Sequence, residues 1–241
     1  MSDHKEAIEA LARHDVRIEP SAWVRGAAAV KDYDAWYASW QRDADAFWSA
    51  AASELEWFEK WRKVCDIELP RHDWFVGGKL NLSYNCLERN IARGLGDKVA
   101  LHSESEGEPP RSFTYRQVLV EVAKIANALK SLGVERGDRV ILYMPLSPEG
   151  LFAMHACARI GAIHSVVYAG MGAEALRNRI DDSGAEVLVC ADATYRRGKV
   201  VDLKCIVDAA TKDRPQVKRV VVWSLKGIGK GTDPREVDFQ E

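Results

Sequence analysis

Residues 139–149, RVILYMPLSPE, decide the fold class of this chain. The apolar run at 139–143 predicts a buried β-strand. Ser147 followed by Pro148 predicts the start of a helix, because Ser favours the N-cap and Pro the first helical position. We expect this helix to reach Ile160. A strand with so few polar residues suits a sheet that is covered on both faces, as in parallel α/β structure.

The segments on either side repeat this alternation of strand and helix. Thr114 and Gln117 have the spacing of a capping box, and one face of the helix that follows is apolar. The residues of that face are Val118, Val122, Ile125, Ala126 and Leu129, with Gly133 at the expected end. Further strands are predicted at 99–102, 163–168, 187–190 and 217–223, and further helices at 173–182 and 201–211. From residue 98 onward we therefore predict an α/β fold.

Composition and charge exclude several classes of function. The 241 residues carry a net charge of −2, which gives no overall basic field for nucleic acid. The most apolar stretch, 150–173, is interrupted by His155, Arg159 and His164, and the N-terminus has no continuous apolar segment. We predict neither a transmembrane span nor a signal peptide. The five cysteines are never spaced C-x-x-C, which argues against disulfides or zinc and favours a cytoplasmic location.

The first 75 residues differ in composition from the rest. They hold seven of the eight tryptophans, with ten basic and fifteen acidic residues, against 24 and 21 in the remainder. Residues that recur at near-helical spacings are Trp36, Trp40 and Phe47, then Leu55, Phe58 and Val64. They predict two or three helices whose aromatic stripe faces a core or a docking surface. We predict a helical region at 1–75 and a second domain at 76–241.

Familiar catalytic motifs are absent or incomplete. Residues 226–232, KGIGKGT, lack the Ser or Thr that follows Gly-Lys in a phosphate loop, and we interpret them as a flexible surface turn. No predicted strand leads into G-x-G-x-x-G. His155 and His164 have no third ligand at metal spacing and are interpreted as satisfied core histidines, and no serine has a G-x-S-x-G context. We assign no catalytic residue and no metal ligand.

Two segments that follow predicted strands have ligand-binding character. Residues 195–199, YRRGK, precede a helix at the sheet edge where ligands of open α/β folds gather. Their arginines and lysine suit phosphate oxygens, and a solvated turn explains the pattern equally well. Residues 168–172, YAGMG, contain small residues that let the backbone approach a ligand. A tight strand-to-helix turn is an equal alternative there.

Residues 74–89, WFVGGKLNLSYNCLER, resemble the opening signature of the AMP-forming acetyl-CoA synthetase family. Other stretches resemble the same family in the same order: FTYR at 113–116, GDRV at 137–140, MP at 144–145 with PE at 148–149, and ACARIGA at 156–162 through SVV at 165–167. Phe47-Trp48 is similar to a pair in that family's N-terminal extension. The resemblance covers nearly the whole chain.

The resemblance implies the N-terminal part of an adenylate-forming enzyme, a helical region followed by one incomplete α/β subdomain. The family joins acetate or another short acid to coenzyme A through an acyl adenylate made from ATP, with Mg²⁺ and release of pyrophosphate. The implied coenzyme A contacts are Tyr168, Ala169 and Gly170 beside the channel, and Arg196 and Lys199 at the phosphates. Ala169 replaces a family glycine. Lys199 replaces a family arginine and cannot reproduce its bidentate fork.

The resemblance also implies that the ATP phosphate loop, the carboxylate pocket, the magnesium-binding segment and the catalytic lysine follow residue 241. We expect a first part of a synthetase that is inactive alone, with coenzyme A and the remainder of the synthetase as partners. Uncovered strands at 166–168 and 220–223 predict self-association. The alternative is a non-catalytic scaffold or regulatory module that docks through its Trp-rich helices. Nucleic acid and membrane partners are not expected.

Overall fold

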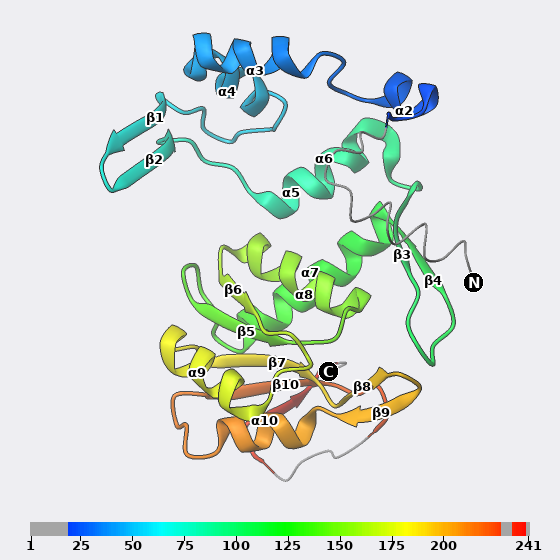
Figure 1. Cartoon of the computed structure of the whole chain (residues 1–241). Coiled ribbons are helices and arrows are strands. Elements are labelled where there is room, and N and C mark those ends of the chain that lie inside the picture. The colour runs from blue at the N-terminus through cyan, green and yellow to red at the C-terminus, as the bar shows by residue number, and fades with distance from the viewer. Residues whose placement is uncertain (1–18, 228–232, 240–241) are drawn as a thin grey trace, which may run out of the picture. The chain divides into compact units, whose positions relative to one another are not determined.

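The structure is a computed structural model that describes residues 19–227 and 233–239 (Figure 1). Most of the KGIGKGT segment and the extreme N-terminus, for which we predict no signal peptide, lie outside the described residues. The chain divides into two compact units. The first comprises Met1–Glu54 and Lys63–Val76, and the second comprises Leu55–Arg62 and Gly77–Glu241.

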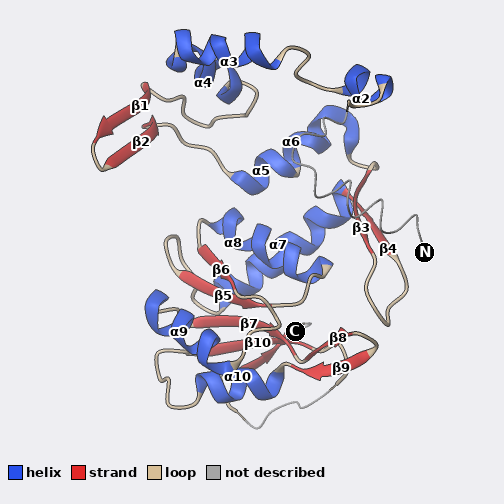
Figure 2. Cartoon of the chain, in the orientation of Figure 1, coloured by secondary structure: helices blue, strands red, loops and turns tan. Residues whose placement is uncertain are grey.

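The described residues of the first unit form three helices and a β-hairpin (Figure 2). The elements are α2 (Ala22–Ala27), α3 (Tyr33–Arg42), α4 (Ala44–Ala52), β1 (Lys63–Glu68) and β2 (Arg71–Val76). Asp32 and Asp43 cap α3 and α4, and each carboxylate accepts a hydrogen bond from the backbone N–H three residues on, at 2.9 and 2.8 Å. These caps satisfy N–H groups that the first helical turn leaves without partners.

The helical prediction is wrong for the end of this region. Val64 lies in β1, and Cys65 pairs with Trp74 across the antiparallel hairpin. Two causes favour strands here. Val64 and Ile67 are β-branched, and Pro70 cannot donate the backbone hydrogen bond that a continuing helix needs.

The aromatic side chains of the first unit contact one another at the surface. Trp36 and Phe47 meet edge to face with ring centroids 5.0 Å apart, and Trp48 and Trp74 do so at 5.7 Å. Trp36, Trp48 and Trp74 are nevertheless exposed, as is Trp23. Trp40 and Phe47 are half-buried, so the aromatic stripe is partly exposed in this unit.

A five-stranded parallel sheet forms the centre of the second unit. Its order is β11-β10-β7-β5-β6. The strands are β5 (Arg139–Tyr143), β6 (Ile163–Val166), β7 (Val187–Ala191), β10 (Arg219–Trp223) and β11 (Glu236–Asp238). β5 and β7 are almost entirely buried, as their apolar sequences predict. The α/β fold is confirmed.

Two pairs of helices cover this sheet. The pairs are α7 (Tyr115–Ser131) with α8 (Pro148–Ile160), and α9 (Ala173–Ser183) with α10 (Lys204–Thr211). Right-handed crossovers place α8 opposite α9, because the chain moves outward from β5 to β6 and then back to β7. Figure 1 shows one pair on each side of the sheet. The loops at the carboxyl ends of the strands are thereby left open to a ligand.

The predicted helix starts and core faces are confirmed. Thr114 and Gln117 form a capping box on α7, Ser147 caps α8, and Pro148 opens it. All five predicted apolar residues of α7 are buried. Gly133 follows the end of α7 with a φ of 88°, a left-handed conformation that favours glycine.

Short elements connect these layers. They are α5 (Leu82–Cys86), α6 (Glu88–Asn90), a π-helical turn (Ile91–Leu95), the hairpin of β3 (Val99–Ser103) and β4 (Arg111–Thr114), and the hairpin of β8 (Ala193–Arg196) and β9 (Lys199–Asp202). The second hairpin corrects our prediction that a helix begins at residue 201, since α10 begins at Lys204. Val200 and Val201 belong to β9, where β-branched residues are favoured.

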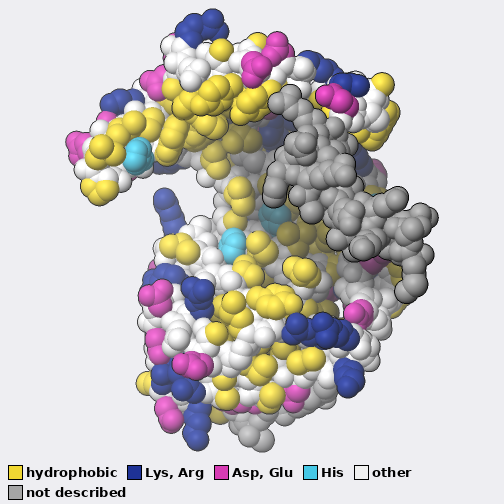
Figure 3. All heavy atoms as spheres, viewed as in Figure 1, with side chains coloured by type: hydrophobic (Ala, Val, Ile, Leu, Met, Phe, Trp, Pro, Cys, Tyr) yellow, Lys and Arg dark blue, Asp and Glu magenta, His cyan; other side chains and the backbone are white. Residues whose placement is uncertain are grey.

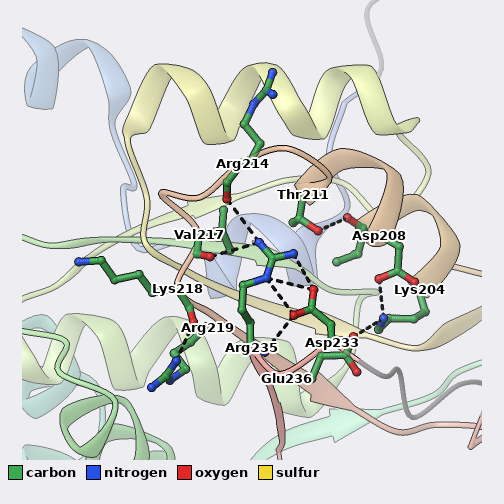
Figure 4. A network of polar contacts seen from close by, with 11 residues as sticks. Lys204, Asp208, Thr211, Arg214, Val217, Lys218, Arg219, Asp233, Arg235 and Glu236 are labelled. Carbon is green, nitrogen blue, oxygen red and sulfur yellow. Dashed lines mark hydrogen bonds and ion pairs between the residues drawn. The ribbon is translucent and has the colours of Figure 1, made fainter.

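Polar contacts attach β11 to the rest of the unit (Figure 4). Lys204, only 4% exposed, lies 2.5 Å from a carboxylate oxygen of Asp208 and 2.5 Å from one of Glu236. Arg235 forms an ion pair of 2.6 Å with Asp233. With β11 beside it, β10 is mostly buried, so the expectation that residues 220–223 are uncovered is wrong.

Candidate functional site

A cavity of about 260 Å³ lies at the carboxyl ends of β5, β6, β7 and β10. Its lining residues are Glu104, Ser105, Glu106, Glu108, Pro145, Leu146, Ser147, Tyr168, Ala169, Gly170, Thr194, Tyr195, Arg196, Trp223 and Leu225. We call it the strand-end pocket. Its position agrees with the rule that ligands of open α/β sheets bind beyond the carboxyl ends of the strands.

The strand-end pocket brings together four of the five site residues predicted from sequence. Tyr168, Ala169 and Gly170 follow β6, and Arg196 ends β8. Lys199 is not among the lining residues. It pairs with Arg196 in the hairpin register and is exposed on the strand that leads away. The basic segment is thus the turn of a hairpin.

The wall made by Tyr168, Ala169 and Gly170 is anchored to the central sheet. A Cβ added at Gly170 would lie 2.4 Å from the ring of Tyr168, so the ring in its present position packs closely over the glycine. The hydroxyl of the buried Tyr143 donates a 2.7 Å hydrogen bond to the carbonyl of Met171, which ties the loop to the end of β5. Burial raises the pKa of Tyr143, so the hydroxyl keeps its proton.

The hairpin turn carries positive charge with no ion-pair partner in the described part of the chain. Arg196, Arg197 and Lys199 are all exposed, and the ion pairs of the described residues include none of them. Arg197 and Gly198 have φ of 53° and 73°. A turn with two positive φ values directs successive strands back on each other, and it groups the three cations at one tip.

Acidic residues form another wall of the pocket, in the loop between β3 and β4. Glu104, Glu106 and Glu108 line the pocket. Glu108 is 3.6 Å from Arg111, and Arg111 also forms a bidentate pair with Glu149 at 2.7 and 3.2 Å. That pair joins β4 to the first turn of α8. The hydrogen bond to Glu149 raises the pKa of Arg111, which stays charged.

Sequence reasoning missed the acidic wall and Asp192. Asp192 is 1% exposed and directly follows β7, and its carboxylate accepts hydrogen bonds from the residues after β10. A polar residue at the end of an entirely apolar strand was the available signal. The acidic wall had no comparable signal, because its proximity to residues 194–196 depends on tertiary structure.

The described residues contain no cluster of potential metal ligands, and their half-buried histidines are not part of a catalytic arrangement. No group of three or more His, Cys, Asp or Glu side chains there could hold a metal ion. His155 corrects our expectation of satisfied core histidines, because its buried Nδ1 has no hydrogen-bond partner among those residues. Burial lowers the pKa of His155 and of His164, and both rings are neutral near pH 7.

No helix within residues 19–227 or 233–239 is long and apolar enough to cross a membrane.

A parallel sheet with helices on both faces and a pocket at its strand ends defines a doubly wound α/β ligand-binding fold. The chain belongs to the AMP-binding enzyme family, whose sequence profile matches residues 87–239. A second profile, the acetyl-coenzyme A synthetase N-terminus, matches residues 33–86. The family recognised from the sequence motifs is confirmed.

Individual relatives agree with this assignment. The acetyl-coenzyme A synthetase of Deinococcus radiodurans is 45% identical over 230 residues, 95% of this chain and 35% of that protein. The 3-hydroxypropionyl-coenzyme A synthetase of Sulfurisphaera tokodaii is 47% identical over 204 residues, 83% of this chain and 30% of that protein. The acetoacetyl-CoA synthetase structure from Streptomyces lividans has a TM-score of 0.78 at 26% identity, covering 91% of this chain and 34% of that one. This chain spans about a third of the length of these relatives.

Proposed function

We propose that this chain is the N-terminal part of an AMP-forming short-chain acyl-CoA synthetase, with a domain boundary near residue 75. The proposed reaction of the whole enzyme converts acetate, ATP and coenzyme A to acetyl-CoA, AMP and pyrophosphate. We further propose that the strand-end pocket binds the nucleotide phosphates of coenzyme A. Relatives that are named for different acids are all similar to this segment. We therefore propose that other parts of the enzyme select the acid.

One observation carries the coenzyme site: Arg196 and the wall at 168–170 line the same pocket. A guanidinium can bind two phosphate oxygens at once, and within residues 19–227 and 233–239 Arg196 has no ion pair that a phosphate would have to replace. Lys199, at the paired position, adds a mobile charge outside the lining. The exposed ring of Tyr168 and the small residues after it let a flat nucleotide approach the backbone.

The adenylation step is proposed to need residues outside the described part of this chain. Mg²⁺ would require oxygen ligands that converge on one point, and the described residues form no such group. We therefore propose that the chain alone turns over no ATP.

We also propose a cytoplasmic location. It is supported by the five free cysteines, because a reducing compartment keeps thiols unpaired.

A second candidate function is favoured by the exposed aromatic side chains of the first unit. Trp23, Tyr33 and Trp36 are exposed, and Trp and Tyr are enriched at protein interfaces. The candidate is a scaffold or regulatory module that keeps the synthetase fold and docks through its Trp-rich helices. Release of AMP or pyrophosphate after complementation with the remainder of the synthetase favours the enzyme, and its absence favours the scaffold.

The coenzyme site is tested by Arg196→Ala in a complete synthetase that contains this segment. We expect the Michaelis constant for coenzyme A to rise about ten- to hundredfold, the loss of one charge-assisted contact, while acetate-dependent ATP–pyrophosphate exchange stays within about twofold. Arg197→Asn is the matched control. It removes a charge from the same turn, tolerates the positive φ, and leaves the pocket lining intact. Equal losses in both half-reactions would show that Arg196 has a structural role instead.

A further inference from the structure

The acidic wall and the basic hairpin turn touch each other across 92 residues of sequence. A carboxylate oxygen of Glu106 accepts a 2.8 Å hydrogen bond from the backbone N–H of Gly198, in the turn that follows Arg196. Glu106 lies between β3 and β4, and Gly198 lies between β8 and β9. The contact therefore joins two hairpins that share no strand pairing with each other or with the central sheet.

A second contact makes the same connection. Gly107 has a φ of 74°, and a Cβ added there would lie 2.6 Å from the ring of Tyr195. The backbone of the acidic loop thus rests against the aromatic side chain that precedes Arg196. The Nζ of Lys226 lies 4.6 Å from the centroid of the same ring, a favourable cation–π distance. The Tyr195 ring thus contacts both the acidic loop and Lys226.

The hairpin needs such contacts because its own pairing is small. β8 and β9 pair over four residues each and form a separate two-stranded sheet. An isolated two-stranded hairpin is marginally stable in water. The acidic loop is better anchored, since Arg111 at the start of β4 forms its bidentate pair with Glu149 of α8.

We propose that Glu106 is a positioning residue for the coenzyme phosphate site. It holds the turn N–H of Gly198, and thereby keeps the side chain of Arg196 directed along the pocket wall. This inference rests on the proposed coenzyme site and adds to it a residue from a distant loop. The carboxylate of Glu106 accepts its hydrogen bond from the N–H of Gly198. It does not contact the phosphate, which is bound by Arg196.

The competing interpretation is that the Glu106 carboxylate occupies the place of a phosphate and weakens coenzyme binding. The two interpretations predict opposite signs. If Glu106 positions the turn, Glu106→Ala frees the turn and raises the Michaelis constant for coenzyme A. If it competes, the same change removes a negative charge and an occupant, and the Michaelis constant falls.

The first experiment measures the turn directly, without a ligand. Amide hydrogen exchange of residues 193–202 is compared between the wild-type chain and Glu106→Ala. We expect faster exchange in this hairpin and unchanged exchange in β5, because β5 lies inside the sheet. Glu106→Gln keeps an acceptor oxygen and is expected to retain most of the protection. Unchanged exchange of the hairpin in Glu106→Ala overturns the inference.

The second experiment measures coenzyme use in a complete synthetase that carries this segment. Glu106→Ala is expected to raise the Michaelis constant for coenzyme A about three- to tenfold, with ATP–pyrophosphate exchange unchanged and Glu106→Gln close to wild type. Asp182→Ala removes an exposed carboxylate from α9, outside the pocket lining, and it should not raise the constant.

The outcomes separate this inference from the proposed function. A raised constant in Arg196→Ala with no rise in Glu106→Ala overturns the positioning role and leaves the coenzyme site standing. A lowered constant in Glu106→Ala also overturns it, in favour of competition. If neither Arg196→Ala nor Glu106→Ala changes the constant, the coenzyme site itself is wrong, and the positioning role falls with it.

Discussion

The buried carboxylate of Asp192 accepts a 2.8 Å hydrogen bond from the backbone N–H of Leu225, so the residue after β7 holds the loop after β10. The hydroxyl of Ser224 donates to the same carboxylate at 3.2 Å. The Asp192 carbonyl accepts from the N–H groups of Leu203 and Lys204, at 2.9 and 3.0 Å. One residue thereby joins the end of β7, the start of α10 and one wall of the strand-end pocket.

We expect Asp192→Ala to lower the free energy of unfolding by about 2–3 kcal/mol, because the hydroxyl of Ser224 and the N–H groups of Leu225 and Lys226 lose a buried carboxylate acceptor. Asp192→Asn keeps one acceptor oxygen and should lose less. Asp182→Ala, at an exposed position on α9, controls for removal of an aspartate. Urea unfolding followed by circular dichroism measures all three. If Asp192→Ala is as stable as Asp182→Ala, the carboxylate does not hold the loop.

Lys199→Ala should affect coenzyme use less than Arg196→Ala does. Lys199 is exposed and lies outside the pocket lining, and a lysine that binds through solvent contributes a screened point charge. We expect the Michaelis constant for coenzyme A to rise less than about threefold, with an effect that disappears at high salt. An increase equal to that of Arg196→Ala would place Lys199 in direct contact with the phosphates.

The sequence predicted the elements whose signals are local. The Ser147-Pro148 helix start and the apolar face from Val118 to Leu129 are confirmed because capping chemistry and helical periodicity act within a few residues. The β1–β2 and β8–β9 hairpins were missed because four to six residues carry little periodicity. The contact between Glu106 and Gly198 has no local signal, since only the fold brings these residues together.

The five cysteines should differ widely in reactivity. Burial raises the pKa of Cys157 to about 12 and raises that of Cys190 as well, and both side chains are buried. Cys205 is exposed, although burial and Asp202 raise its pKa somewhat. Because the thiolate is the nucleophile, iodoacetamide at pH 8 should modify Cys205 well before Cys157 or Cys190.

Mass spectrometry of peptides after timed alkylation measures this order. The thiols of Cys157 and Cys190 should react only when urea unfolds the chain. Cys205→Ser should remove the fast alkylation of the peptide that contains residue 205. Alkylation of Cys157 in the native chain at the rate of Cys205 would contradict the buried position of α8 against the sheet.

Acid should weaken the attachment of β11. The hydrogen bond from Arg235 lowers the pKa of Asp233 to about 2, below the value of about 3.9 expected in the unfolded chain. A lowered folded pKa gives stability that is present above pH 4 and is lost as the pH falls toward 2. The contribution is on the order of 2–3 kcal/mol at neutral pH.

Arg235→Gln tests this pH dependence. The variant should be less stable than wild type at pH 7, and the difference should shrink between pH 4 and pH 2, where Asp233 of the wild type becomes protonated. Urea unfolding at pH 7, 4 and 2.5 measures it. A stability difference that stays constant over this range would show that the Asp233 charge does not contribute.

Self-association should occur through the β6 edge. β6 is an edge strand of the sheet, bonded to β5 on one side only among the described residues. Ile163 and Val166 are 56% and 54% exposed, and Leu146 beside the pocket is 93% exposed. Figure 3 shows hydrophobic side chains gathered on one face of the second unit. At about 25 cal/mol per Å², covering 300 Å² of apolar surface is worth roughly 7 kcal/mol before the cost of association.

We therefore expect the chain to form dimers or larger species as its concentration rises, and Val166→Lys to shift it toward monomer, because a lysine on an edge strand opposes pairing. Val120→Lys is the control, since Val120 is similarly exposed but lies on α7. Sedimentation velocity over a hundredfold range of concentration measures the species. A wild-type monomer throughout, with uniform hydrogen-exchange protection across residues 98–224, would show that β6 needs no partner strand and that this segment is stable by itself.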